Sequence, residues 1–288
     1  MLSLSRQLVH HQRVSAALLK LRTAANLTSR VLAERINISQ SKVSRVERGK
    51  ALPTAEEVTA WAQATGADPD TLSELLAELD AALTEFATWQ VALRDGLAGH
   101  QEQIRELETT AAVVHSYQMA VIPGLLQTAE YARRVFQLAD PGSDQDYASA
   151  VARRLDRQQA LYDETRQFEF LLTEHALRVR VGPASLVAPQ LDRIAQISTL
   201  SNVTIGVIPS TALATTMVMH AFILFEPFDD EEGSFVVVEL VHGEVFVSDP
   251  QGLKLYHDRL NRLRQMAVFG DDARALFTAI AREQRPAT

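Results

Sequence analysis

The sequence predicts a chain of two domains: a mainly α N-terminal domain of five helices, then an α+β C-terminal domain. In the second domain we expect a four- to five-stranded sheet covered by helices. Apolar residues recur at helical spacing up to about residue 86, whereas runs of residues that favour strands begin at Phe168. A length of 288 residues is comfortable for two domains. The predicted boundaries are a lead-in at 1–11, a helical domain at 12–77, a helical connector at 78–107 and the α+β domain at 108–288.

The first helix is predicted from about residue 14 to residue 26, where apolar residues form an amphipathic pattern. Two short helices follow. Thr28 is expected to cap the first of them and Ser39 the second, because Ser and Thr hydroxyls accept hydrogen bonds from the first turn of a helix. Asn37 stands at the corner between them, where a left-handed backbone is needed. Gly49 is expected to end the second helix.

The inner side of the two short helices is predicted from apolar spacing: Val31, Leu32 and Ile36 on the first, with Ala33 as a small contact residue, and Val43 and Val46 on the second. The other residues of the second helix face outward. They are hydrogen-bonding or cationic: Gln40, Ser41, Lys42, Ser44, Arg45 and Arg48. Such a helical face suits the major groove of DNA.

Residues 12–77 resemble the helix-turn-helix of the XRE family, which includes Cro and the lambda and 434 repressors. The resemblance is carried by Leu27-Thr28, Leu32-Ala33, Ser39 to Ser44, Glu47 and Gly49, with Arg22 in the preceding helix. It implies a lambda-repressor-like fold, with the helix from Ser39 as the recognition helix. It also implies that Arg22 and Glu47 form a structural ion pair with no DNA role.

By the same resemblance, the base-reading candidates are Gln40, Ser41 and Arg45, with Lys42 and Ser44 near base edges or phosphate. The phosphate candidates are Ser29, Arg30, Arg48 and Lys50. The family usually has Gln after the threonine, where it contacts phosphate. Here that residue is Ser29, which is shorter, so Arg30 or Lys50 are the alternative anchors.

Charge is distributed unevenly along the chain. The formal net charge is −8. Residues 1–52 carry ten Lys or Arg against two Glu, which gives +8, and the rest of the chain therefore carries −16. A cationic N-terminal segment followed by an acidic remainder is typical of a DNA-binding protein whose other parts must not adhere to the phosphate backbone.

Two further helices are expected to complete the small domain, at residues 55–65 and from residue 71 to about residue 86. Trp61 lies on the apolar stripe of the first, so it is interpreted as a core residue rather than a base-stacking one. The connector is expected to be helical, with a break near residues 96–99.

The α+β domain is predicted to begin with helices at 108–117, 128–138 and 144–162. Strands follow at 168–172, 203–208, 220–225, 234–240 and 244–247. A helix at 188–200 separates the first two strands, and two helices return after Pro250.

This region resembles the domain of unknown function that follows the helix-turn-helix in many actinobacterial Scr/WhiJ-like or antitoxin-like regulators. The resemblance is carried by the string Pro-Gly-Leu-Leu-Gln-Thr at 123–128, and by Glu108, Tyr131-Ala132, Arg154, Arg157-Gln158, Glu174, Leu177-Arg178, Gln190-Leu191, Pro209 and Glu239. It implies a small partner protein encoded nearby. The effector or partner candidates are Arg154, Arg157, Gln127, Tyr131 and Arg178.

Arg153, Arg154 and Arg157 share one helical face, which suits an anion or an acidic partner. The alternative interpretation is salt bridging to acids such as Asp156, Glu164 or Glu174. Glu174 and Arg178 have the spacing of a helical ion pair, which explains both residues.

No catalytic motif was found, so no enzyme activity, cofactor or metal is expected. A metal site could be formed by His220, His242 and Glu244, but no third ligand has a convincing spacing, so surface or sheet-edge histidines are the favoured interpretation. The acidic residues 229–232 are interpreted as a solvated turn rather than a calcium loop. Without cysteine, a signal peptide or an apolar run long enough to cross a membrane, the chain is expected to be cytoplasmic, and nucleoid-associated when bound to DNA.

The sequence thus predicts a DNA-binding transcriptional regulator that forms a homodimer and binds an inverted-repeat operator in double-stranded DNA. Its C-terminal domain would sense a small ligand or a small partner protein. An alternative is an antitoxin-like protein that neutralises such a partner and regulates its own operon.

Overall fold

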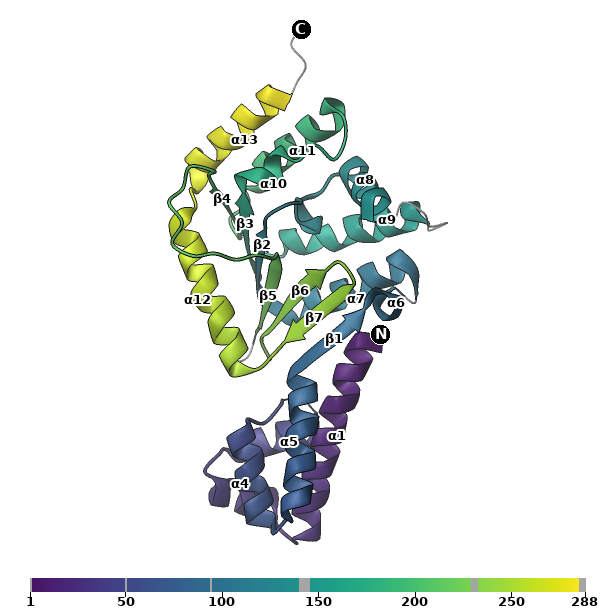
Figure 1. Cartoon of the computed structure of the whole chain (residues 1–288), viewed down its shortest axis with the longest axis vertical. Helices are drawn as coiled ribbons and strands as arrows, with labels where there is room; N and C mark the ends of the chain where they lie inside the picture. Colours follow the sequence, from purple (N-terminus) through teal and green to yellow (C-terminus); the bar gives the residue numbers. More distant parts are fainter. Residues whose placement is uncertain (1, 50, 94, 140–145, 229–232, 285–288) are drawn as a thin grey trace. The chain divides into compact units, whose positions relative to one another are not determined.

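A computed structural model describes residues 2–49, 51–93, 95–139, 146–228 and 233–284. The chain forms two compact units, Met1–Ala87 with Phe246–Asp249, and Thr88–Val245 with Pro250–Thr288. The predicted fold class is confirmed: helices make up most of the first unit, and the second combines a sheet with helices (Figure 1).

The first unit contains five helices: α1 (Leu2–Ala24), α2 (Ser29–Ile36), α3 (Gln40–Glu47), α4 (Ala55–Thr65) and α5 (Pro69–Leu83). Helix α1 packs against α3, α4 and α5, and α2 packs against α3 and α4. The expectation of an irregular lead-in at residues 1–11 was wrong, because α1 begins at Leu2. The sequence offers no capping residue near residue 12 that would start a helix there.

The core of this unit is formed by apolar residues of α1, α2, α3, α4 and α5. Trp61 is fully buried and its Nε1 donates to the carbonyl of Leu18 at 3.2 Å, which confirms its role in the core. Leu32, Val43 and Val46 are fully buried as expected. Val31 is not part of the inner side: it is exposed, because α2 directs Leu32 and Ala33 into the core instead.

The sheet has the strand order β1-β7-β6-β5-β2-β3-β4. Its strands are β1 (Thr84–Thr88), β2 (Ala111–Gln118), β3 (Gln167–Thr173), β4 (Val203–Ile208), β5 (Phe222–Pro227), β6 (Phe235–Leu240) and β7 (Gly243–Val247). Strands β2, β3 and β4 pair in parallel, whereas β5 is antiparallel to both β2 and β6. The five predicted strands are present, and the sheet contains two more.

The two additional strands correct two helix predictions. Residues 108–117 were expected to be helical, but α7 (Gly96–Thr110) ends there and β2 follows, between β3 and β5. The helix expected to run to residue 86 ends at Leu83, and β1 follows. The sequence of β2, Ala-Ala-Val-Val-His-Ser-Tyr-Gln, has no strict alternation because nearly the whole strand is buried. Pairing with distant strands therefore decides its conformation.

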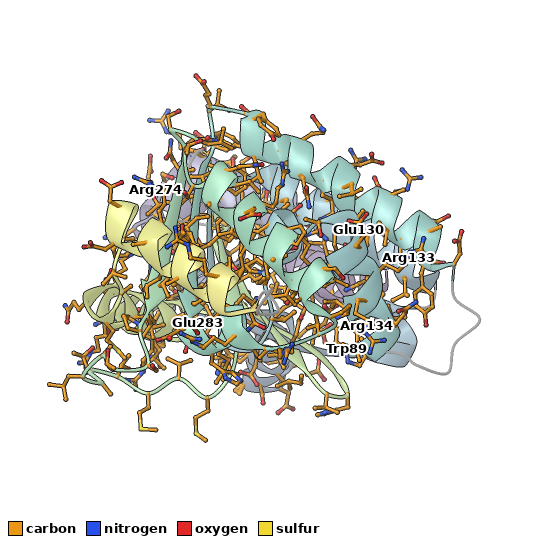
Figure 2. The ribbon with its side chains drawn as sticks, turned by 90° about the horizontal axis from the view of Figure 1, so that it is seen from above. Trp89, Glu130, Arg133, Arg134, Arg274 and Glu283 are labelled. Atoms are coloured by element: carbon orange, nitrogen blue, oxygen red, sulfur yellow. The ribbon has the colours of Figure 1, made fainter. Side chains whose placement is uncertain are left out.

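The other elements of the second unit are α6 (Trp89–Ala92), η1 (Gly124–Leu126), α8 (Ala129–Ala139), α9 (Tyr147–Arg157), η2 (Gln158–Tyr162), α10 (Glu174–Arg178), α11 (Ala184–Ile197), α12 (Pro250–Met266) and α13 (Gly270–Gln284). Helix α11 packs against both α13 and α8. Figure 2 shows this arrangement, with Glu283 on α13 and Arg134 on α8. The break in the connector precedes Gly96, which has a φ of +74°.

Helix α12 is joined to the sheet by a partly buried polar network. His115 Nδ1 lies 2.6 Å from Glu169 Oε2, and its Nε2 lies 3.3 Å from Glu226 Oε2. Arg264 of α12 donates to both oxygens of Glu169, at 2.7 and 2.6 Å. His257 lies 3.6 Å from Glu226. Glu169, Glu226 and His115, on three strands, thus face Arg264 and His257 of α12.

This network perturbs the pKa of its members in opposite directions. Burial alone would raise the pKa of Glu169, but hydrogen bonds from His115 and Arg264 outweigh burial and lower it to about 2. Burial would lower the pKa of His115, but its hydrogen bonds to Glu169 and Glu226 outweigh burial and raise it above 6.5.

We expect a Glu169→Gln variant to lose about 1–3 kcal/mol of unfolding free energy near pH 5.5, because Arg264 and His115 would lose a charged acceptor. A lowered Glu pKa stabilises the fold above the unfolded value of 4.5, so the difference from wild type should shrink as pH falls towards about 2. A raised His pKa stabilises it below 6.5, so the difference should also shrink as pH rises through the folded pKa of His115. Denaturant unfolding of wild type and variant at several pH values measures both of these pH trends.

The control is Glu102→Gln, which removes an acid paired with Arg105 on the surface of the same unit and should change stability by less than about 0.5 kcal/mol. A Glu169→Gln effect that stays constant between pH 3 and pH 8 would contradict the assignment.

Candidate nucleic-acid interface

The corner between α2 and α3 is built by local hydrogen bonds, as the sequence predicted. Thr28 Oγ1 accepts from the backbone N–H of Val31 at 3.2 Å, and Ser39 Oγ accepts from that of Lys42 at 3.1 Å. Asn37 ends α2 with φ 55° and ψ 46°, in the left-handed region. These caps satisfy backbone groups that a short helix would otherwise leave unpaired, so they fix where α3 begins.

An ion pair joins the end of α3 to α1. Arg22 Nη2 donates to Glu47 Oε2 at 2.9 Å, its Nε also donates to Glu47, and its Nη1 donates to the carbonyl of Leu27 at 2.7 Å. The hydrogen bonds to Glu47 raise the pKa of Arg22. The predicted structural pair is therefore confirmed, and it directs the guanidinium of Arg22 into the domain.

The exposed side of α3 begins with Gln40 and Ser41, which are both exposed. Ser44 and Arg45 are half-buried, and the Nε atom of Arg45 is itself buried. Gln40 Nε2 donates to Ser29 Oγ at 3.3 Å. Ser29, on α2, thus contacts the first residue of α3, and the two polar side chains share one surface.

Lys42 was predicted to lie near base edges or phosphate, but it pairs with an acid of α4. Its Nζ is 2.9 Å from Glu57 Oε1 of α4, and the two side chains retain only 17% and 15% of their exposure. Glu57 also completes the capping box of α4 by accepting from the backbone N–H of Thr54. This geometry favours a role for Lys42 in holding α3 on α4 rather than in reading bases.

The phosphate candidates differ in their surroundings. Arg30 is 77% exposed and its Nε lies 3.2 Å from Glu34 one turn away, an arrangement that contributes little to stability. Arg48 is exposed at the C-cap of α3. Lys50 lies outside the described residues.

In the second unit, the structure brings three of the five effector candidates together. Arg154 Nη1 donates to Gln127 Oε1 at 2.7 Å, and its Nε donates to Gln101 Oε1 at 3.1 Å. Arg157 also donates to Gln101, and it forms two hydrogen bonds with Glu108, at 3.0 and 2.6 Å. The salt-bridge interpretation is thus right for Arg157, although its partner is none of the acids proposed for it.

The other two candidates lie apart from this group. Arg178 Nε donates to Glu174 at 2.6 Å and Nη1 donates to Glu283. Two carboxylates of the chain itself therefore neutralise its guanidinium. Tyr131 is 1% exposed within α8, and no hydrogen bond among the described residues links its side chain to Arg154 or Arg157. Neither Arg178 nor Tyr131 is therefore hydrogen-bonded to the group around Arg154.

Sequence reasoning missed Gln101 and Phe136 as neighbours of Arg154. The guanidinium carbon of Arg154 lies 4.0 Å from the centre of the Phe136 ring. Both residues follow the apolar or polar pattern of an ordinary helix, so only the packing of α7 and α8 against α9 identifies them.

Within the described ranges, no group of three or more His, Asp or Glu residues is arranged to hold a metal ion. In the same part of the chain, no helix combines the length and apolar character needed to cross a membrane.

Comparisons with known proteins define first the class and then the family. Residues 13–75 match a helix-turn-helix domain, which agrees with the capped α2–α3 corner. Residues 101–279 match the domain of unknown function DUF5753. Because that match covers more than half of the chain, the protein belongs to the DUF5753 family. It combines this domain with an N-terminal helix-turn-helix.

Two solved structures show weaker similarity. The clp gene regulator ClgR from Corynebacterium glutamicum is 26% identical, covering 35% of this chain and 92% of that one, with a TM-score of 0.22. The archaeal chromatin protein TrmBL2 is 13% identical, covering 84% of this chain and 87% of that one, with a TM-score of 0.32. No curated protein matches the chain.

The Arg22–Glu47 pair generates a stability prediction. We expect Arg22→Met and Glu47→Met each to lower the unfolding free energy by about 1–3 kcal/mol, because each leaves a partly buried partner unsatisfied. The double variant should lose less than the sum of the two. Denaturant unfolding measures all three.

Arg30→Met is the matched control, since its pair with Glu34 is exposed and should contribute less than about 0.5 kcal/mol. Equal losses for Arg22→Met and Arg30→Met would show that the buried pair has no special structural role.

Proposed function

We propose that the protein is a cytoplasmic DNA-binding transcriptional regulator in which α3 is the recognition helix. The observation that carries the proposal is the orientation of α3. Its apolar side is buried and its last residue, Glu47, is tied to α1, while Gln40 and Ser41 remain exposed. We propose no catalytic role.

The residues of α3 match the chemistry of base edges. A Gln amide can donate to N7 and accept from N6 of adenine, and an Arg guanidinium can donate twice to guanine. We assign these contacts to Gln40 and Arg45, with Ser41 and Ser44 as neighbours. The bond between Gln40 and Ser29 supports the first assignment, because it restricts the orientation of the Gln40 amide before DNA binds.

Phosphate contacts would come from the cationic residues around α3. Arg48 is exposed at its end, and Arg30 and Ser29 lie on α2. Lys50 is retained as a candidate from the sequence. The acidic balance of the remaining chain favours specific over diffuse binding, since residues 53–288 would be repelled by the backbone.

A single small domain buries too little surface for tight operator binding, so we propose a homodimer on an inverted repeat. We assign the dimer contact to the loop between β4 and β5. There Leu213, Met217 and Met219 are 89%, 79% and 85% exposed. Residues 203–225 contain no Asp, Glu, Lys or Arg, so two copies of this acidic unit could meet there without charge repulsion.

Two hydrogen bonds hold this loop against α12. Thr215 Oγ1 donates to the carbonyl of Arg262 at 3.0 Å, and Arg259 Nη1 donates to Thr216 Oγ1 at 2.9 Å. An anchored loop loses less conformational freedom on association, which favours a docking role. The second unit would also supply the regulatory input, through a small ligand or a small partner protein.

For DNA binding, we expect Gln40→Ala to weaken operator affinity by about 1–3 kcal/mol, roughly 5-fold to 150-fold, with non-specific affinity unchanged because no charge is lost. Arg45→Ala should weaken both operator affinity and non-specific affinity, and operator affinity should fall further. Genomic footprinting identifies the operator, and titration of operator and scrambled duplexes then measures the effect.

Arg13→Ala is the control: it removes an exposed cation of the same domain that pairs with Glu78, and it should leave the discrimination intact. If the Gln40→Ala protein still separates operator from scrambled DNA as well as wild type does, the base-contact assignment fails. An affinity that does not change with salt concentration would contradict phosphate contact altogether.

For the dimer, we expect Leu213→Glu/Met217→Glu to weaken association by at least roughly 30-fold, since it places carboxylates at the centre of the contact. Sedimentation velocity across a concentration series measures this. Val241→Glu is the control, because Val241 is 99% exposed elsewhere in the same unit. A wild-type monomer at every concentration, or equal effects of both changes, would reject the assignment.

A further inference from the structure

Arg154 of α9 is half-buried in the second unit, and the groups that contact it do not neutralise it. One face of its guanidinium lies 4.0 Å from the Phe136 ring centre. Gly124 lies close enough that an added Cβ would be 3.4 Å from Arg154 Nε. Its two hydrogen-bond acceptors are the neutral amides of Gln101 and Gln127. No carboxylate of the described chain lies within 4.0 Å of it, unlike Arg157 or Arg178.

Three of the five N–H donors of Arg154 have no acceptor within the described residues. The bonds to Gln101 and Gln127 use one hydrogen of Nε and one of Nη1. The two hydrogens of Nη2 and the second of Nη1 remain. Nη2 has no partner among the described residues and is not fully buried, so it retains contact with solvent. The Nη1–Nη2 edge is one with which Arg binds a carboxylate in two parallel bonds.

Among the described residues, Arg154 has no ion-pair partner, although charged groups lie near it. Arg157 is neutralised by Glu108 through two hydrogen bonds. Burial and the nearby Arg157 lower the pKa of His100 to about 4, so His100 is neutral at pH 7. Glu239 of β6 is close enough to affect Arg154 electrostatically, but it is exposed and forms no ion pair with it.

A half-buried cation without an ion-pair partner is costly, because burial removes part of its water without supplying an opposite charge. The pKa of Arg154 reflects this cost: burial, with the repulsion of Arg157, lowers it to about 9. Proteins usually pair a buried guanidinium with a carboxylate, as this chain does at Arg157.

We propose that the Nη1–Nη2 edge of Arg154 is a binding site for the carboxylate of a small molecule. The planar fork fits the two carboxylate oxygens. Gln101, whose Oε1 accepts from Arg154, carries a further donor in Nε2, which has no acceptor in the described part of the chain. A singly charged anion matches the single charge of Arg154, whereas a phosphate dianion would place one more negative charge near Glu108 and Glu239. This inference concerns the second unit alone and is independent of DNA binding.

The test is a titration of the full chain with sodium acetate against sodium chloride at equal ionic strength. Thermal unfolding should show a saturable rise of roughly 3–6 °C when acetate reaches about ten times its Kd. Arg154→Gln should abolish the rise. Arg153→Gln is the matched control, because it removes an exposed cation one residue away, and it should keep the wild-type response.

A second variant keeps the proposal testable if Arg154→Gln does not fold. Gln101→Glu places a carboxylate between Arg154 and Arg157 while keeping the same shape. It should raise the unfolding temperature without ligand and reduce the acetate response. An equal rise with chloride, a response retained in Arg154→Gln, or a stronger response to inorganic phosphate than to acetate would overturn the proposal.

Discussion

The proposed function depends on two ion pairs that hold α3 from both ends. Lys42 in its first turn pairs with Glu57 of α4, and Glu47 at its end pairs with Arg22 of α1. Val43 and Val46 are buried between these two attachments. An eight-residue helix is marginal on its own, so tertiary contacts must fix its direction. Because both pairs point inward, the outer side of α3 stays available.

The sequence was informative wherever a structure depends on near neighbours. The caps Thr28 and Ser39 and the left-handed Asn37 were all predicted, because each acts within three or four residues of its own position. The sequence also marked Lys42 as outward-facing, which was wrong. The spacing of Lys and Arg on a helix cannot show which of them an acid from another helix will bind. The acid that binds Lys42 is Glu57, which lies 15 residues further along the chain.

The same limit explains what was missed in the second unit. Strand β2 was predicted as a helix because its partners, β3 and β5, lie far along the chain. Arg154 and Arg157 look alike in sequence, one turn apart on α9. Their different surroundings come from residues on other elements: Glu108 reaches Arg157, while Arg154 contacts amides, an aromatic ring and a glycine of the described chain.

The position of β2 has a consequence for synthesis of the protein. Its antiparallel neighbour β5 begins at Phe222, so a ribosome must add about a hundred more residues after Tyr117 before the two can pair. The helix-turn-helix unit, whose helices are complete by residue 83, can form much earlier. During that interval the apolar nascent strand has an open edge, which is a hazard for aggregation. Fast translation or chaperone depletion should therefore harm the second unit first.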